Sequence, residues 1–213
     1  MERFIIRGFD LIELHNIDCM EAMKQMPDKA FDLAIVDPPY GIGTCQEYGN
    51  TRGIPKSYPK KEWDSDIPKA EYWAELFRVA KNQIVFGGNY MTKFLPVSRG
   101  WIYWRKLAGG NYSDGELAWT SFDTVLREFT KRTDQGNRFH PTQKPVKLYE
   151  WILNNYASPG QRILDTHGGS FSLAIACDTM GYDFTGYEID AEYYEAAKKR
   201  LEEHKRQGKM VFV

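Results

Sequence analysis

An apolar run passes directly into a rigid polar turn at Leu33-Ala34-Ile35-Val36-Asp37-Pro38-Pro39-Tyr40. Four apolar residues in succession are typical of a strand buried on both faces of a parallel sheet. A parallel strand delivers the residues that follow it to the carboxyl edge of the sheet, where ligands bind in open α/β folds. The stretch therefore predicts a binding site at residues 37–40.

Strand-like and helix-like segments alternate on both sides of this site. The predicted strands are 11–14, 33–36, 83–86, 163–164 and 184–187, and the predicted helices are 20–25, 70–79, 145–156, 170–180 and 191–204. This alternation predicts an α/β fold with a doubly wound, mostly parallel sheet. Residues 100–130 differ, because short apolar runs between turn residues predict antiparallel strands and loops there. Their tryptophans, Trp101, Trp104 and Trp119, are interpreted as core residues rather than base-stacking ones.

Length and composition predict a single domain covering residues 1–213, since 213 residues with 42% hydrophobic content can fill one core. A net charge of −1 means that any contact with a nucleic acid is local. Two basic stretches, at 52–61 and 127–138, are either solvated loops or such contacts. The three cysteines lie far apart, which predicts reduced thiols in the cytoplasm and no metal site. No segment approaches the roughly 20 apolar residues of a membrane helix, so no membrane partner is expected.

An exocyclic nucleobase amine fits the predicted site at 37–40. The lone pair of such an amine is delocalised into the ring, so the nitrogen needs acceptors on its N–H groups that favour a pyramidal geometry. The prolines remove two N–H donors and leave the carbonyls of Asp37 and Pro38, with the Asp37 carboxylate, as acceptors. Tyr40 adds a flat face for a base extruded from a duplex, a contact worth about 1–3 kcal/mol per base. The alternative interpretation is a proline-rich turn of structural use alone.

A second polar turn, Asp165-Thr166-His167-Gly168-Gly169-Ser170, follows the predicted strand at 163–164. Glycines let a ligand approach the backbone, and a helix that begins here presents free N–H groups to a carboxylate. Asp165 is placed to take an ammonium group. Glu188, at the end of the next predicted strand, is placed to take the hydroxyls of a ribose. An amino acid joined to a ribose describes S-adenosyl-L-methionine, which is the predicted cofactor.

Together these motifs resemble the permuted, or β-group, DNA amino-methyltransferases. In that family Asp-Pro-Pro-Tyr precedes Asp-Pro-Phe-x-Gly-Ser-Gly, as Asp37 precedes Asp165 here. His140-Pro141-Thr142-Gln143-Lys144-Pro145 is similar to the segment that helps to hold the methionine part of the cofactor. Asn16-Ile17-Asp18-Cys19 is similar to the segment near the cofactor adenine, and residues 86–90 to a strand end that lines the site. The likeness extends from about residue 10 to about residue 205.

The resemblance implies a fold, an activity and a set of site residues. The fold is a Rossmann-like methyltransferase sheet with circularly permuted motif order. The activity is methyl transfer from S-adenosyl-L-methionine to the N6 amine of an adenine flipped out of double-stranded DNA. The implied catalytic residues are Asp37, Pro38, Pro39 and Tyr40. The implied cofactor-binding residues are Asp18, Thr142, Lys144, Asp165, His167, Gly169, Ser170 and Glu188.

Several alternatives stay open at this point. Adenine N6 is preferred because Asp37 begins the acceptor motif, whereas the cytosine-N4 form usually begins with Ser; cytosine N4 is the alternative acceptor. Thr166-His167 stands where the family has Pro-Phe, and Phe171 where it has its last glycine, so a DNA-binding relative without turnover is a second alternative. RNA or protein substrates are a third. We predict that His167 tunes cofactor affinity, with a general-base role as the alternative.

The resemblance also bears on the less regular parts of the chain. Residues 100–139 occupy the place of a short target-recognition segment. Residues 44–66, rich in Gly, Pro, Tyr and Lys, predict a long loop that orders over DNA or cofactor. A homodimer is compatible with the resemblance.

Overall fold

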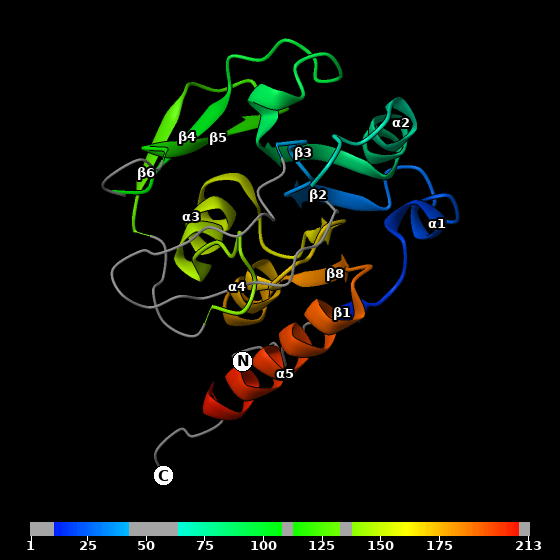
Figure 1. The fold of residues 1–213 in the computed structure, drawn as a ribbon, viewed down its shortest axis with the longest axis vertical. Helices are drawn as coiled ribbons and strands as arrows, with labels where there is room; N and C mark the ends of the chain where they lie inside the picture. The colour runs from blue at the N-terminus through cyan, green and yellow to red at the C-terminus, as the bar shows by residue number, and fades with distance from the viewer. Residues whose placement is uncertain (1–10, 43–63, 108–112, 133–137, 209–213) are drawn as a thin grey trace, which may run out of the picture.

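The computed structural model describes residues 11–42, 64–107, 113–132 and 138–208 (Figure 1). The predicted loop at 44–66 falls almost wholly outside the described residues, and so do the basic stretch at 52–61 and Cys45. Within the described part, no helix combines the length and the apolar character that crossing a membrane requires.

The described strands form one eight-stranded sheet in the order β1-β8-β7-β2-β3-β5-β4-β6. Their bounds are β1 (Ile12–His15), β2 (Phe31–Val36), β3 (Ala80–Phe86), β4 (Trp101–Arg105), β5 (Gly115–Thr120), β6 (Arg127–Thr130), β7 (Arg162–Asp165) and β8 (Asp183–Tyr187). Among these strands β5 alone is antiparallel to its neighbours, β3 and β4. The predicted mostly parallel sheet is confirmed.

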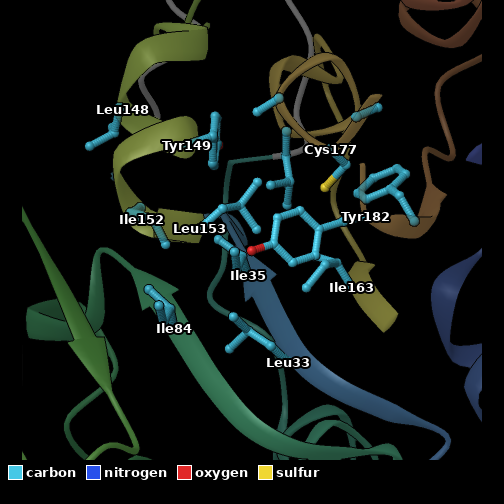
Figure 2. Close-up of a cluster of buried hydrophobic side chains, with 14 of the residues drawn as sticks. Leu33, Ile35, Ile84, Leu148, Tyr149, Ile152, Leu153, Ile163, Cys177 and Tyr182 are labelled. Atoms are coloured by element: carbon cyan, nitrogen blue, oxygen red, sulfur yellow. The ribbon is translucent and has the colours of Figure 1, made fainter. Parts of the chain in front are cut away.

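Helices cover both faces of this sheet (Figure 1). Their bounds are α1 (Cys19–Met23), α2 (Ala70–Val79), α3 (Val146–Tyr156), α4 (Ser172–Met180) and α5 (Ala191–Gly208), with a 3-10 turn η1 (Gly88–Tyr90). In β2, Leu33 and Ile35 belong to a core with α3 and α4, whereas Ala34 and Val36 belong to a second core with α1 and α2. Figure 2 shows the first core, with Leu33 and Ile35 of β2 on the side of the sheet where Leu153 of α3 lies. Burial on alternate sides explains the unbroken apolar run of β2 and confirms the doubly wound fold.

The middle block departs from the sequence-based prediction in one strand. β4 and β5 form the expected antiparallel pair, but β6 pairs in parallel with β4. Val125 and Leu126, the last short apolar run of this block, are each 61% exposed and precede β6. An apolar pair is too short to specify a strand, and β6 is instead anchored by Phe129, which packs on the first core. The prediction that the three tryptophans are core residues is confirmed for Trp104 and Trp119, which are buried, whereas Trp101 is half-buried and packs against the second core.

The topology collects the predicted site residues at one edge of the sheet. β2, β7 and β8 are parallel, so the residues that follow them, including Asp37 and Glu188, meet at the carboxyl edge. β5 runs the other way, and therefore its first residues reach the same edge. Glu116, second in β5, lies beyond the end of β3 for this reason, because the ladder between them begins at Phe86 and Ala118.

Candidate active site

Asp37 is fixed by hydrogen bonds to both carboxylate oxygens. Oδ1 accepts from the Tyr40 hydroxyl at 2.7 Å, and Oδ2 accepts from Lys144 Nζ at 2.5 Å. The turn itself is held by the buried Asp64, whose Oδ1 accepts from the backbone N–H groups of Tyr40 at 2.7 Å and Gly41 at 3.1 Å. The acceptor carboxylate is therefore held in one orientation by side chain and backbone together.

Lys144 bridges Asp37 and a second carboxylate, Glu116. Its Nζ lies 3.1 Å from Glu116 Oε2, and its side chain is only 3% exposed. Lys106, just after β4, forms an ion pair with the other Glu116 oxygen. These four residues, Asp37, Glu116, Lys106 and Lys144, are called the acceptor cluster below. Two carboxylates and two ammonium groups make it formally neutral, which suits its burial.

The charge states within the acceptor cluster follow from its geometry. Burial raises the pKa of Asp37, and the Lys144 ammonium opposes this rise. Burial also acts to raise the pKa of Glu116, but Lys144 and Lys106 lower it to about 2. Although burial disfavours its charge, Lys144 has a pKa above the ordinary value because Asp37 and Glu116 face it. At neutral pH Lys144 is therefore positive and Glu116 negative.

Tyr40 lies in an aromatic stack. Its ring stacks on Tyr90, with centroids 5.2 Å apart and planes at 19°. A Cβ on Gly87 would come within 2.2 Å of the Tyr40 ring, and Gly87 has φ +65°, so only glycine fits there. Tyr90 is 46% exposed. The carboxyl edge thus presents flat aromatic surface to solvent beside the Asp37 carboxylate.

The second half of the site lies around the glycine turn after β7. Glu188 Oε2 accepts from the N–H of Gly169 at 2.7 Å, and its Oε1 accepts from the N–H of Asp190 at 2.8 Å. Gly169 has φ +50°, and a Cβ there would lie 3.3 Å from the His140 ring. Burial raises the pKa of Glu188. The turn therefore offers a narrow backbone surface between a carboxylate and an imidazole.

Asp165 is a buried carboxylate at the centre of the sheet edge. Its Oδ1 accepts a hydrogen bond from the backbone N–H of His167 at 3.0 Å. Burial raises its pKa to about 8, and the nearby charges of Asp37 and Glu188 add to this effect. A buried carboxylate of this kind is costly unless it meets a cation or a proton. Asp165 is thus suited to an ammonium group supplied by a ligand.

The other predicted cofactor residues have structural contacts of their own. Asp18 caps α1 by accepting from the N–H of Met20 at 2.7 Å. Thr142 Oγ1 lies 3.2 Å from His140 Nδ1, next to the glycine turn. Ser170 Oγ lies 3.1 Å from Ser172 Oγ and is buried two residues before α4. These residues border the turn, whereas Lys144, which the resemblance assigns to the cofactor, lies on Asp37.

Sequence reasoning missed Glu116, Lys106 and Asp64 as parts of the site. Glu116 and Lys106 lie at the two facing ends of the β4–β5 pair, which places both at the carboxyl edge. These two residues could have been predicted to lie at the site from the hairpin alone. When an antiparallel hairpin follows a parallel strand, its second strand starts at the carboxyl edge of the sheet. Asp64 lies 24 residues after Tyr40, so no spacing argument could have linked them.

His167 is a neutral side chain in this site. Burial lowers its pKa to about 4, its Nδ1 lies 2.9 Å from Thr166 Oγ1, and its ring meets the Tyr72 ring edge-on at 5.3 Å. A group with that pKa is too weak a base to act efficiently near pH 7.

We therefore expect His167→Phe to leave turnover within about tenfold and cofactor affinity equal or higher, as an apolar ring would keep the contact with Tyr72. Calorimetry and single-turnover rates check this, with His204→Phe as a distant control; a large rate loss with intact binding would contradict it.

The strand order, the acceptor turn after β2 and the glycine turn after β7 define a Rossmann-like methyltransferase with permuted motif order. The family model described as DNA methylase matches residues 103–199. The Type II methyltransferase M2.DpnII of Streptococcus pneumoniae is 37% identical, over 90% of this chain and 90% of that protein. The chain therefore belongs to the DNA methylase family, and the resemblance stated from its motifs is confirmed.

Solved structures share the fold. The M1.HpyAVI–SAM complex has a TM-score of 0.60 and 23% identity, covering 89% of this chain and 100% of that one. The PvuII DNA methyltransferase, described as cytosine-N4-specific, has a TM-score of 0.61 and 12% identity, covering 91% of both. Since the same fold is found in a cytosine-N4 enzyme, the acceptor base must be argued from the site.

Proposed function

We propose that this chain transfers a methyl group from S-adenosyl-L-methionine to the exocyclic N6 amine of adenine in double-stranded DNA, with the target base flipped out of the duplex. The observation that carries the proposal is the Asp37 carboxylate, which binds the cationic nitrogen of Lys144 and the hydroxyl of Tyr40. This carboxylate suits an amine that gains positive charge during the reaction. The protein acts in the cytoplasm, and residues 100–139 serve as its target-recognition segment.

The residues after β2 act on the acceptor. Asp37 accepts an N–H of the amine and favours the pyramidal nitrogen that can attack. As the nitrogen becomes cationic, its attraction to the carboxylate grows, and only interactions that strengthen in this way accelerate the step. Tyr40 orients the base through its ring face and orients Asp37 through its hydroxyl. After transfer, Asp37 or water takes the proton from the methylated nitrogen.

The residues around the glycine turn fit the cofactor. Glu188 retains lone pairs for ribose hydroxyls, because each oxygen accepts one backbone N–H and a carboxylate oxygen can accept two bonds. Asp165 provides the buried negative charge for the ammonium, and the narrow surface at Gly169 admits a ligand close to the backbone. When bound, S-adenosyl-L-methionine supplies an electrophilic methyl group on a sulfonium. Asp18 and Thr142 border the site and complete the proposed cofactor set with His167 and Ser170.

A product analysis tests the acceptor. The chain is incubated with cofactor labelled in its methyl group and with mixed-sequence double-stranded DNA, and the DNA is digested to nucleosides. Label in N6-methyl-2′-deoxyadenosine supports the proposal, since Asp37 begins the acceptor motif. Label in N4-methylcytosine alone would replace the acceptor and spare the mechanism. Cofactor binding without label transfer to any DNA would favour the relative that lacks turnover.

Cofactor binding should release a proton from Asp165. The pKa of about 8 means that this carboxyl is mostly protonated in the free chain at neutral pH. An ammonium beside it favours the ionised form, so the bound state holds fewer protons and affinity rises with pH between about 6 and about 7.5. Calorimetry in buffers of different ionisation enthalpy measures the proton. Asp165→Asn should abolish the release, and an affinity that does not change with pH would contradict the assignment.

A further inference from the structure

We propose that Lys144 is a positioning residue of the acceptor site. Its ammonium group binds and orients Asp37 while no base is present, and it moves to Glu116 when the target amine arrives. This inference rests on the proposed function, because it concerns the same carboxylate. It departs from the resemblance, which assigns Lys144 to the cofactor.

The position of Lys144 Nζ is the first argument. The ammonium lies 2.5 Å from Asp37 Oδ2 and 3.5 Å from the Tyr40 hydroxyl, and it lies 4.6 Å from the centroid of the Phe86 ring. It thus fills a cation-binding place made by a carboxylate and aromatic surface. A methylated amine carries positive charge on nitrogen and needs the same carboxylate. The ammonium therefore occupies the place that the reacting nitrogen requires, and it must leave Asp37 for the base to enter.

Glu116 gives the displaced lysine a partner. Its Oε2 is already 3.1 Å from Lys144 Nζ, so a small side-chain movement transfers the ammonium from one carboxylate to the other. Removing one partner of a buried ion pair is strongly unfavourable because it leaves an unpaired charge. With Glu116 in place, Lys144 is paired before and after the base binds. The acceptor cluster thereby exchanges a lysine cation for a substrate cation at nearly constant charge.

The surroundings of Asp37 determine how its ionisation responds to these two residues. The charged or titratable groups that face it are Tyr40 on its own turn, Glu116 from β5, Lys144 from the segment before α3, Tyr149 from α3 and Asp165 at the end of β7. Lys106 acts on it through Glu116. Among these groups, Lys144 is the cation that contacts Asp37. Glu116 is the anion that binds the same ammonium and so competes with Asp37 for it.

Two substitutions should therefore move the pH profile in opposite directions. Lys144→Met removes the cation that favours the ionised form of Asp37, so the pKa of Asp37 should rise. The acidic limb of the pH–rate profile should then lie higher by about one unit or more, and activity should fall sooner as the pH is lowered. Glu116→Gln removes an anion near Asp37 and leaves Lys144 with Asp37 alone. The limb should then fall to lower pH. The rate at the optimum should drop by about tenfold, because the base must displace a cation that has no second carboxylate.

The experiment measures single-turnover rates of adenine methylation from about pH 5 to about pH 9, at saturating cofactor so that the titration of Asp165 does not enter. Lys147→Met is the matched control, since Lys147 is 67% exposed and pairs with Glu150 on the surface. Calorimetry should give both variants a cofactor affinity close to that of the native chain. Lys144→Arg, which keeps the charge, should leave the acidic limb in place, and it serves if Lys144→Met does not fold.

The outcomes separate this inference from the proposed function. If the native chain forms no N6-methyladenine, the proposed function fails. If the native chain is active but the two variants lose activity without opposite shifts, Lys144 and Glu116 have a structural role and the inference fails. A loss of cofactor affinity in Lys144→Met, with an unshifted pH profile, would return Lys144 to the cofactor site and also overturn it.

Discussion

Asp37→Ala should lower the methyl-transfer rate by on the order of 10²–10³-fold while the cofactor binds nearly as well as to the native chain. Asp37 meets an amine that becomes cationic only as the methyl arrives, so its contribution grows along the reaction and belongs to the rate rather than to binding. The same carboxylate is held by Tyr40 and Lys144, which limits its reorientation. Its removal also leaves Lys144 with Glu116 alone.

Single-turnover kinetics and calorimetry separate these two effects. Asp32→Ala is the matched control, because Asp32 lies near the start of β2, at the end of the strand away from Asp37, and pairs with the exposed Lys81 at 2.7 Å. That control should keep its rate at saturation. A result in which Asp37→Ala abolished cofactor binding and left the saturated rate unchanged would move the acceptor site elsewhere.

The parallel part of the sheet was predictable from sequence because burial on two faces leaves an unmistakable pattern. β2 carries an unbroken apolar run, and α2 was predicted with the bounds that the structure gives it, Ala70–Val79. In both segments local pattern and tertiary burial agree. The turns at Asp37 and Asp165 followed, since the end of a parallel strand has a fixed place in the sheet.

The start of α4 was predicted two residues early, at Ser170, and the reason lies in Phe171. Phe171 has φ +48°, a left-handed backbone conformation that is unfavourable for any residue with a side chain. A residue in this conformation cannot continue a right-handed helix, so α4 begins only at Ser172. Its buried ring fills the space beside Gly168, where a Cβ would lie 2.1 Å from it. Packing of this ring offsets the backbone strain. Such a balance depends on tertiary contacts that no local pattern reports.

The acceptor cluster could be predicted only in part, because its members come from distant segments. Lys144 and Asp37 are 107 positions apart, and the motif that contains Lys144 pointed to the cofactor instead. Both sites lie at the same sheet edge, so a motif can border one and extend a long side chain into the other. Lysine has a flexible four-carbon stem, and its charged end need not lie near its own backbone. Motif order therefore identifies the edge, and side-chain geometry assigns each residue to a site.

Glu188→Ala should weaken cofactor binding by about tenfold to a hundredfold and leave the rate at saturation nearly unchanged. Hydrogen bonds to a charged group contribute about 1.5–3 kcal/mol, and roughly 1.4 kcal/mol corresponds to one decade of affinity. The ribose hydroxyls are the same in the ground state and the transition state, so the loss of their hydrogen bonds to Glu188 affects binding alone. The structure adds a second contribution, because Glu188 holds the N–H of Gly169 at 2.7 Å and thereby shapes the glycine turn.

A comparison of substitutions distinguishes these two contributions. Glu188→Gln keeps an oxygen that can accept from Gly169 but removes the charge, and so it should retain the turn and lose part of the affinity for the ribose hydroxyls. Glu192→Ala, an exposed position at the start of α5, is the control and should bind normally. Equal losses for Glu188→Ala and Glu188→Gln would mean that the charge carries the effect. Native affinity for Glu188→Ala, measured by calorimetry, would mean that Glu188 makes no hydrogen bond to the cofactor and would remove it from the cofactor site.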